Sequence, residues 1–241
     1  MERWANKCAI VTGAASGIGK KITIALLKNK INVLALDVNT EKLSLLNHEW
    51  MQLEGSNKLC AMRCNISDEK DLEKAFSFVE TEMSSVDILV NNAGVLELSR
   101  IIVAESDRAA FEKLLNINVL ATAMCINRAV RSMRQRNVEG HIFNINRYCY
   151  SRATSCSSIV HPLAFQPLRA HVLFRLSLAN FVEFTFVLCN LLNINPGLVE
   201  TDIFKQFTNH IMDVLKSMPI LKPEDIANAV TYALSLRPEV Q

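Results

Sequence analysis

The sequence predicts an α/β fold in which helices flank one doubly wound parallel sheet. Short runs of apolar and β-branched residues alternate with longer amphipathic segments over the first 146 residues, and the same order resumes after Asn193. Runs that are apolar throughout are typical of strands buried on both faces, and helix-length connections between them indicate βαβ units. No internal repeat interrupts this order, so we expect residues 1–241 to form a single domain.

The predicted elements follow this alternation from the N-terminus. The apolar runs predict strands at residues 7–12, 32–37, 58–65, 87–91, 140–146 and 191–195. The amphipathic segments predict helices at residues 17–30, 41–52, 69–83, 108–135 and 224–235. Pro223 directly precedes the last helix, where a proline is favoured because an N–H in the first turn lacks a helical partner anyway.

The charge balance argues against nucleic acid as a partner. Lys and Arg number 26 and Asp and Glu 24, and the resulting net charge of +2 creates no strong overall field. Four arginines gather near the end of the fourth predicted helix: Arg128, Arg131, Arg134 and Arg136. Cations suit the C-terminal end of a helix dipole, so we expect these side chains to lie on a solvated face.

Cysteine usage and hydropathy predict a cytoplasmic protein without a membrane span. The seven cysteines include no Cys-x-x-Cys pair and no Cys/His metal spacing, so we expect reduced thiols and no bound metal. The N-terminal residues do not resemble a signal peptide. The most apolar window, residues 170–192, contains Arg175, Asn180 and Glu183, and a charge at mid-bilayer costs about 2.5–3.5 kcal/mol.

A glycine-rich segment, TGAASGIG at residues 12–19, lies between the first predicted strand and the first helix. Gly13 allows a tight turn, Gly17 lets the backbone approach a pyrophosphate, and Gly19 lets helix and strand pack closely. The helix N-terminus adds unpaired N–H groups and a partial positive charge. An ordinary turn is the alternative, but the flanking strand and helix favour a dinucleotide site. The predicted cofactor-binding residues here are Gly13, Ser16, Gly17, Ile18 and Gly19.

Asp37 ends the second predicted strand, where a carboxylate accepts hydrogen bonds from a ribose diol and repels a 2′-phosphate. The alternative is that Asp37 only caps the helix that starts at residues 39–41. A basic side chain at position 16 or 38 would contact that phosphate, but these positions hold Ser16 and Val38, and neither is cationic. NAD is therefore favoured. NADP stays possible because cations stand close by in the sequence: Lys20, Lys21 and Lys42.

These motifs resemble those of the short-chain dehydrogenases/reductases. The T-G-x-x-x-G-x-G pattern is that family's glycine loop, and NNAG at residues 91–94 is its second signature. NPGLVET at residues 195–201 resembles the P-G turn that lies beside the nicotinamide in the family. Asn118 matches the helix asparagine that supports a catalytic water there.

The resemblance covers about residues 1–146 and 193–241 and implies a Rossmann-type sheet that binds NAD(P). It implies hydride transfer between the nicotinamide and an alcohol or carbonyl carbon, and a homodimer or homotetramer. Carried over by position, further cofactor-binding residues are Asn65, Ile66, Asn92, Ala93, Gly94, Pro196, Gly197, Val199 and Thr201. Asn65 stands where the family usually has an Asp near the adenine, and an amide can still bond the adenine amino group.

The implied substrate is a small hydrophobic alcohol or carbonyl compound. Residues 1–4, 129–142 and 196–203 resemble the farnesol-dehydrogenase-like branch, which points to an isoprenoid alcohol. The family's substrate loop corresponds to residues 206–218, and its apolar side chains agree with a hydrophobic ligand. The family continues past Gln241 into a final edge strand, so we expect that strand to be truncated and its neighbour's edge to be unpaired.

The catalytic stretch departs from the family pattern. In the family a Ser steadies the substrate oxygen, and the lysine of a Tyr-x-x-x-Lys pair lowers the tyrosine pKa toward the working range. Here Arg147 stands at the Ser position, and no Tyr-x-x-x-Lys occurs in the chain. His161 is a candidate for the Tyr position, since histidine titrates near neutrality. Phe165, four residues on, supplies no charge to assist it, so a chance alignment is the favoured alternative.

Residues 147–192 also differ in composition. They contain no Lys, no Gly and one acid, Glu183, while the other 23 of the 24 acids lie elsewhere. Our hypothesis is that this segment was read in the wrong codon frame, with the proper frame regained near Asn193. Sequencing the transcript across the codons for residues 140–199 tests it. We expect another frame to encode Ser and Tyr-x-x-x-Lys; a transcript in which no frame encodes them overturns the hypothesis. The alternative function is then a catalytically inactive, NAD-binding pseudo-enzyme.

Overall fold

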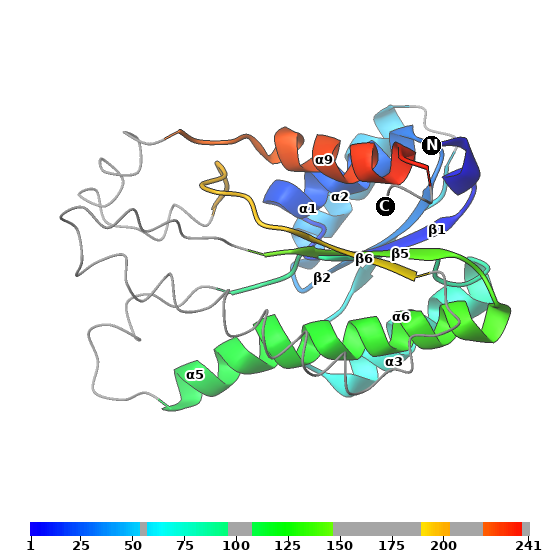
Figure 1. The fold of residues 1–241 in the computed structure, drawn as a ribbon. Helices are drawn as coiled ribbons and strands as arrows, with labels where there is room; N and C mark the ends of the chain where they lie inside the picture. The colour runs from blue at the N-terminus through cyan, green and yellow to red at the C-terminus, as the bar shows by residue number, and fades with distance from the viewer. Residues whose placement is uncertain (54–56, 96–107, 147–188, 203–218, 238–241) are drawn as a thin grey trace.

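The computed structural model describes residues 1–53, 57–95, 108–146, 189–202 and 219–237 (Figure 1). They form a six-stranded sheet in the order β3-β2-β1-β4-β5-β6, and each neighbouring pair is parallel. The strands are β1 (Cys8–Thr12), β2 (Asn32–Asp37), β3 (Leu59–Arg63), β4 (Ile88–Asn91), β5 (Gly140–Ile145) and β6 (Cys189–Ile194). The predicted doubly wound parallel sheet is confirmed.

Helices cover both faces of this sheet: α1, α2 and α9 lie on one side, and α3, α5 and α6 on the other (Figure 1). Their bounds are α1 (Gly17–Lys28), α2 (Thr40–Gln52), α3 (Glu69–Glu82), α5 (Arg108–Leu115), α6 (Thr122–Arg136) and α9 (Pro223–Ser235). The predicted helix at residues 108–135 is not uniform, because a π-helical segment, Asn116–Ala121, separates α5 from α6. A π-helical turn changes the direction of the side chains that it carries.

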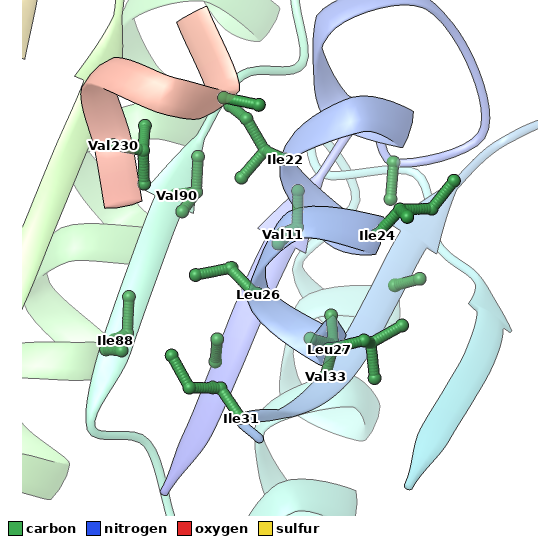
Figure 2. Close-up of a cluster of buried hydrophobic side chains, with 14 of the residues drawn as sticks. Val11, Ile22, Ile24, Leu26, Leu27, Ile31, Val33, Ile88, Val90 and Val230 are labelled. Carbon is green, nitrogen blue, oxygen red and sulfur yellow. The ribbon is translucent and has the colours of Figure 1, made fainter. Parts of the chain in front are cut away.

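The strands are buried on both faces, as their continuous apolar runs predict. All five residues of β1 are buried. Ala9 and Val11 pack into the cluster on the side of α1 and α9, whereas Cys8 and Ile10 pack into the cluster on the side of α3 and α6. Figure 2 shows the first cluster, which includes Ile22, Leu26, Val33, Val90 and Val230. Full burial of one such side chain contributes about 1.5–3 kcal/mol.

The helical stretch Arg108–Arg136 is long and apolar enough to cross a membrane, judged by length and composition alone. Helices in the core of water-soluble proteins pass the same test. In this protein Cys125, Ala129 and Met133 of α6 pack into the hydrophobic cluster that also contains Leu89 of β4. The apolar window at residues 170–192 lies almost wholly outside the described residues.

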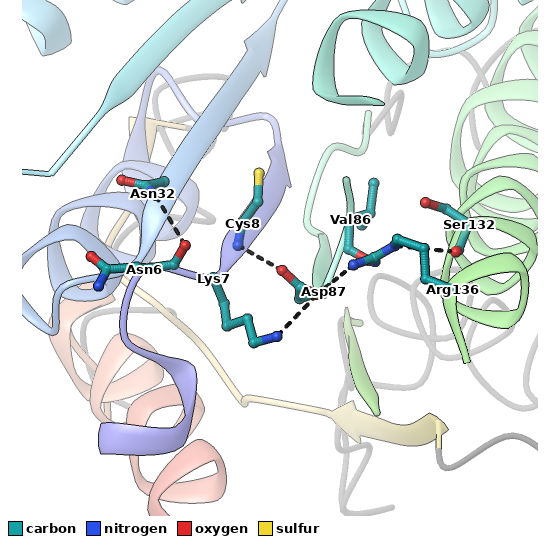
Figure 3. Close-up of polar contacts among 8 residues, drawn as sticks. All are labelled: Asn6, Lys7, Cys8, Asn32, Val86, Asp87, Ser132 and Arg136. Carbon is teal, nitrogen blue, oxygen red and sulfur yellow. Dashed lines mark hydrogen bonds and ion pairs between the residues drawn. The ribbon is translucent and has the colours of Figure 1, made fainter. Parts of the chain in front are cut away.

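A buried carboxylate, Asp87, joins three elements just before β4 begins (Figure 3). The side chain of Asp87 accepts from the backbone N–H of Cys8 at 2.9 Å and from the guanidinium of Arg136 at 3.0 Å, and Lys7 Nζ lies 3.9 Å away. Arg136 also donates to the carbonyl of Val86. The expectation that Arg136 lies on a solvated face is therefore wrong, because the buried Asp87 offers it an opposite charge.

We expect Asp87→Asn to lower the free energy of unfolding by about 2 kcal/mol, because it leaves the partly buried Arg136 without its counter-charge. Denaturant unfolding measures the change. The control is Glu112→Gln, which breaks the exposed Arg108–Glu112 pair and should cost less than about 0.5 kcal/mol. Equal effects of the two variants would contradict a structural role for Asp87.

Candidate functional site

Polar residues and glycines gather at the carboxyl ends of the central strands. Thr12 ends β1, Asp37 ends β2 and Asn91 ends β4. From β1 the sheet extends through β2 and β3 in one direction and through β4, β5 and β6 in the other. In open parallel α/β sheets, ligands bind outside the carboxyl ends of the strands at such a switch point.

In the glycine loop after β1, steric constraints explain why glycines occupy positions 13, 17 and 19. Gly13 (φ +63°) and Gly17 (φ +52°) have left-handed backbone conformations, which other residues adopt only with strain. A Cβ on Gly13 would lie 2.9 Å from the Cα of Ala93. A Cβ on Gly19 would collide with the carbonyl oxygen of Gly13 and lie 2.5 Å from Asn92 Nδ2. The loop therefore touches the segment after β4 with no room for a side chain.

Hydrogen bonds hold the same contact. Asn92 Nδ2 donates to the carbonyl oxygens of Thr12 and Gly13, each at 3.0 Å. In return the Thr12 hydroxyl accepts from the backbone N–H groups of Asn92 at 3.0 Å and Ala93 at 3.1 Å. Sequence reasoning assigned no role to Thr12. Its position as the first residue of the T-G-x-x-x-G-x-G pattern was the available signal.

Asp37 connects the glycine loop to the next strand. One carboxylate oxygen accepts from the backbone N–H of Ala15 at 3.0 Å, and the other accepts from the N–H of Asn39 at 3.0 Å. The residue that caps α2 is Asn39, whose side chain accepts from the N–H of Lys42 at 2.9 Å. Asp37 is therefore not the cap of α2, although it accepts from the N–H of the residue that is. Each of its oxygens keeps a lone pair for a further donor.

Asn65 and Ile66 follow β3 on the neighbouring side. The side-chain oxygen of Asn65 accepts from the N–H and the hydroxyl of Ser67, at 3.2 and 2.8 Å. The two lone pairs of the amide oxygen are thus both used, and the Asn65 NH₂ group is left to donate to a base. In this arrangement the side chain does not accept from the adenine amino group, contrary to the expectation from the sequence. Ile66 is 7% exposed and packs in the hydrophobic core, so only its backbone is available to a cofactor.

Asn118 lies in the π-helical segment and holds the chain after the NNAG signature. Its side-chain oxygen accepts from the N–H of Val95 at 2.9 Å, and its NH₂ group donates to the Val95 carbonyl at 3.0 Å. A Cβ on Gly94 would come within 3.3 Å of the Asn118 oxygen. The structure therefore brings Asn118 to Gly94 and Val95, and its role in supporting a catalytic water stays a prediction.

The P-G turn after β6 returns toward the glycine loop. Pro196 and Val199 are buried, whereas Gly197 is exposed, and no atom of the described residues lies within 4 Å of its Cβ position. A Cβ on Gly17 would lie 3.1 Å from the Cγ2 of Thr201. The Thr201 hydroxyl is buried and has no hydrogen-bond partner among the described residues.

The lysines that kept NADP possible all pair with acids. Lys20 lies 2.5 Å from Glu49, and Lys21 lies 2.9 Å from Glu224. The hydrogen bond from Lys21 lowers the pKa of Glu224. Lys42, in the first turn of α2, lies 3.1 Å from Asp202, which directly follows Thr201.

A row of asparagine side chains crosses three strands at the carboxyl edge. Asn91 of β4 donates to Asn144 of β5 at 2.9 Å, and Asn144 donates to Asn193 of β6 at 3.1 Å. The three residues are paired in register. The sequence did not lead us to predict this row. The available signal was that each of the three asparagines stands at or next to the end of its strand.

The described cysteines are free thiols, and burial raises the pKa of each. The pKa of Cys64 and of Cys125 reaches about 12, so neither is a nucleophile near neutral pH. Within the described ranges no cluster of His, Cys, Asp and Glu could hold a metal ion. Arg147, His161 and the predicted substrate loop at residues 206–218 lie outside the described residues.

We expect Gly19→Ala to lower the free energy of unfolding by about 2 kcal/mol, because the added methyl group meets backbone rather than open space. Gly197→Ala is the matched control and should change stability by less than about 0.5 kcal/mol, since no neighbour in the described part of the chain lies within 4 Å of its Cβ position. Denaturant unfolding of both variants decides. A Gly19→Ala protein as stable as the parent would show that the loop is not packed as described.

Comparison with known proteins agrees with this geometry. The family model described as short chain dehydrogenase matches residues 7–149. The chain is 33% identical over 251 residues to dehydrogenase/reductase SDR family member 11 of Mus musculus, with coverage of 100% of this chain and 93% of the relative. It is 31% identical over 242 residues to farnesol dehydrogenase of Aedes aegypti, with coverage of 100% and 95%.

Among solved structures, 7α-hydroxysteroid dehydrogenase in complex with NADH and 7-oxo glycochenodeoxycholic acid superposes with a TM-score of 0.78. It is 26% identical, with coverage of 98% of this chain and 89% of that one. An alcohol dehydrogenase from Thermococcus sibiricus in complex with 5-hydroxy-NADP, 22% identical, has the same fold, with a TM-score of 0.76 and coverage of 98% and 93%. By its glycine loop, its sheet and these relatives, the chain belongs to the short-chain dehydrogenase/reductase family.

Proposed function

We propose that the carboxyl edge of the sheet binds NAD, and that the protein exchanges hydride between NAD and a hydrophobic alcohol or carbonyl compound. The observation that carries the proposal is the amino end of α1. The Ser16 side chain does not cap this helix, whereas Asn39 caps α2 and Asp68 caps α3. The N–H groups and partial positive charge at this end of α1 suit a pyrophosphate.

The neighbouring side chains fit the remaining parts of a dinucleotide. The lone pairs left on Asp37 suit the two hydroxyls of a ribose. The buried Thr201 hydroxyl, beside Gly17 and without a partner among the described residues, suits a phosphate or carboxamide group. When NAD is bound, its nicotinamide would supply the hydride acceptor. Asp37, Thr201 and the amino end of α1 would hold the dinucleotide.

We favour NAD over NADP because of the charged side chains around the proposed nucleotide site. Asp37 places a carboxylate where a 2′-phosphate would extend, and like charges repel. The nearby cations, Lys20, Lys21 and Lys42, are each engaged with an acid. Both cofactors occur among the solved relatives, in complexes with NADH and with 5-hydroxy-NADP.

A hydrophobic substrate, with farnesol as the leading candidate, is supported by two relatives. One is named farnesol dehydrogenase and is 31% identical. The other is a 7α-hydroxysteroid dehydrogenase, 26% identical. Both names describe alcohols with large apolar frameworks.

The second candidate is an NAD-binding protein without catalysis. The observation in its favour is the sequence itself, which has no Tyr-x-x-x-Lys and has Arg147 at the family's Ser position. Oxidation of an alcohol releases a proton as well as a hydride, so turnover needs a group that accepts that proton. Both candidates share the nucleotide site.

We expect Asp37→Ala to raise the Kd for NAD about tenfold, because ribose hydroxyls lose hydrogen bonds to a charged acceptor. The ratio of the Kd for NADP to the Kd for NAD should fall at the same time. Titration calorimetry measures the two Kd values. Asp68→Ala is the control, since Asp68 also accepts from two backbone N–H groups, but from those of α3, which it caps. An unchanged NAD affinity in Asp37→Ala would show that Asp37 does not contribute to NAD binding.

Turnover distinguishes the two candidates. The protein is incubated with NAD and a panel of primary alcohols that includes farnesol, and NADH is followed by absorbance. Alcohol-dependent NADH formation supports the oxidoreductase and excludes the pseudo-enzyme. NAD binding without NADH formation supports the pseudo-enzyme, and absence of NAD binding overturns both.

A further inference from the structure

We propose that the Lys42–Asp202 ion pair is a specificity element that disfavours NADP by holding Lys42 away from a 2′-phosphate. This inference rests on the proposed nucleotide site. Lys42 Nζ and Asp202 Oδ2 are 3.1 Å apart, and their side chains are 42% and 51% exposed. The two residues are 160 positions apart in the chain, so the pair exists only in the folded protein.

The pair joins the two segments that flank the glycine loop. Asp202 directly follows Thr201, whose methyl group lies 3.1 Å from the Cβ position of Gly17. On the other side, Lys42 belongs to the first turn of α2, which begins at Thr40, three residues after the last residue of β2. A nucleotide on the amino end of α1 would therefore lie between the elements that carry the two charges.

Lys42 is also connected to the carboxylate proposed to bind ribose. Asp37 accepts from the N–H of Asn39, and Asn39 accepts from the N–H of Lys42. Two hydrogen bonds through Asn39 therefore connect the backbone of Lys42 to Asp37. A phosphate on the 2′-oxygen would extend from the ribose at Asp37 and meet Lys42 if that amine were available.

Asp202 opposes this contact in two ways. It already neutralises Lys42, so a phosphate must compete with an anion that the chain itself provides. Once displaced, Asp202 would stay close to the phosphate and repel it. Lys21 offers a comparison, because its pair with Glu224, at 2.9 Å, links α1 to α9 and includes no residue of α2.

Asp202→Asn should therefore free Lys42 and improve NADP binding. Titration calorimetry at low salt is carried out with NAD and with NADP on the full chain. We expect the Kd for NADP to fall about five- to tenfold, the effect of one charge-assisted contact, while the Kd for NAD changes less than about twofold. Lys42→Ala should act in the opposite direction and weaken NADP further.

Two further variants make the result specific. The double variant Asp202→Asn with Lys42→Ala should lose the gain in NADP binding. Glu224→Gln, which removes the same charge and frees Lys21 instead, should leave the ratio of the two Kd values unchanged. Because both pairs are exposed, thermal unfolding should show all variants folded.

The inference is overturned if Asp202→Asn leaves the ratio unchanged, if Glu224→Gln shifts it equally, or if the double variant keeps the gain. Failure of the proposed function is recognised separately. In that case the parent protein binds neither NAD nor NADP before any substitution is made, and the inference falls with it.

Discussion

The contact between the glycine loop and the segment after β4 is the constraint on which the rest of the site depends. Gly13 and Gly19 approach Ala93 and Asn92 so closely that a methyl group on either glycine would meet backbone or the Asn92 amide. Thr12 and Asn92 then exchange hydrogen bonds across the contact. Because β1 and β4 flank the point at which the strand order reverses, this contact positions the amino end of α1 above the switch point.

Stability and ligand binding rest on opposite edges of the same sheet. At the amino edge, the buried Asp87 joins β1 and α6 through Cys8 and Arg136. At the carboxyl edge, the asparagine row aligns the ends of β4, β5 and β6, and Asp37 holds the glycine loop against β2. A buried charge is stable only beside its partner, whereas groups at the carboxyl edge keep hydrogen-bonding capacity for a ligand.

The discrimination between NAD and NADP that we propose depends on the ion pairs that lysines near the glycine loop form with acids. Lys20, Lys21 and Lys42 are close to the glycine loop or to Asp37 in the sequence, and Lys42 is the one that we propose would meet a 2′-phosphate if it were unpaired. In the folded chain, three acids from other elements engage them. In our proposal, the net charge near the 2′-oxygen of a nucleotide depends on these pairs, and Asp202 is the acid that pairs with Lys42.

The sequence alone determined the parallel sheet, with β2 at its predicted bounds, and the positions of the glycines that the loop requires. Both depend on local features: a strand buried on both faces is apolar throughout, and a left-handed turn excludes most side chains. Tertiary structure decided the partner of Arg136, the asparagine row, the Asn118–Val95 bonds and the pairing of Lys42. These contacts join residues far apart in the chain, and their partners depend on how strands and helices are placed in space, which no local pattern records.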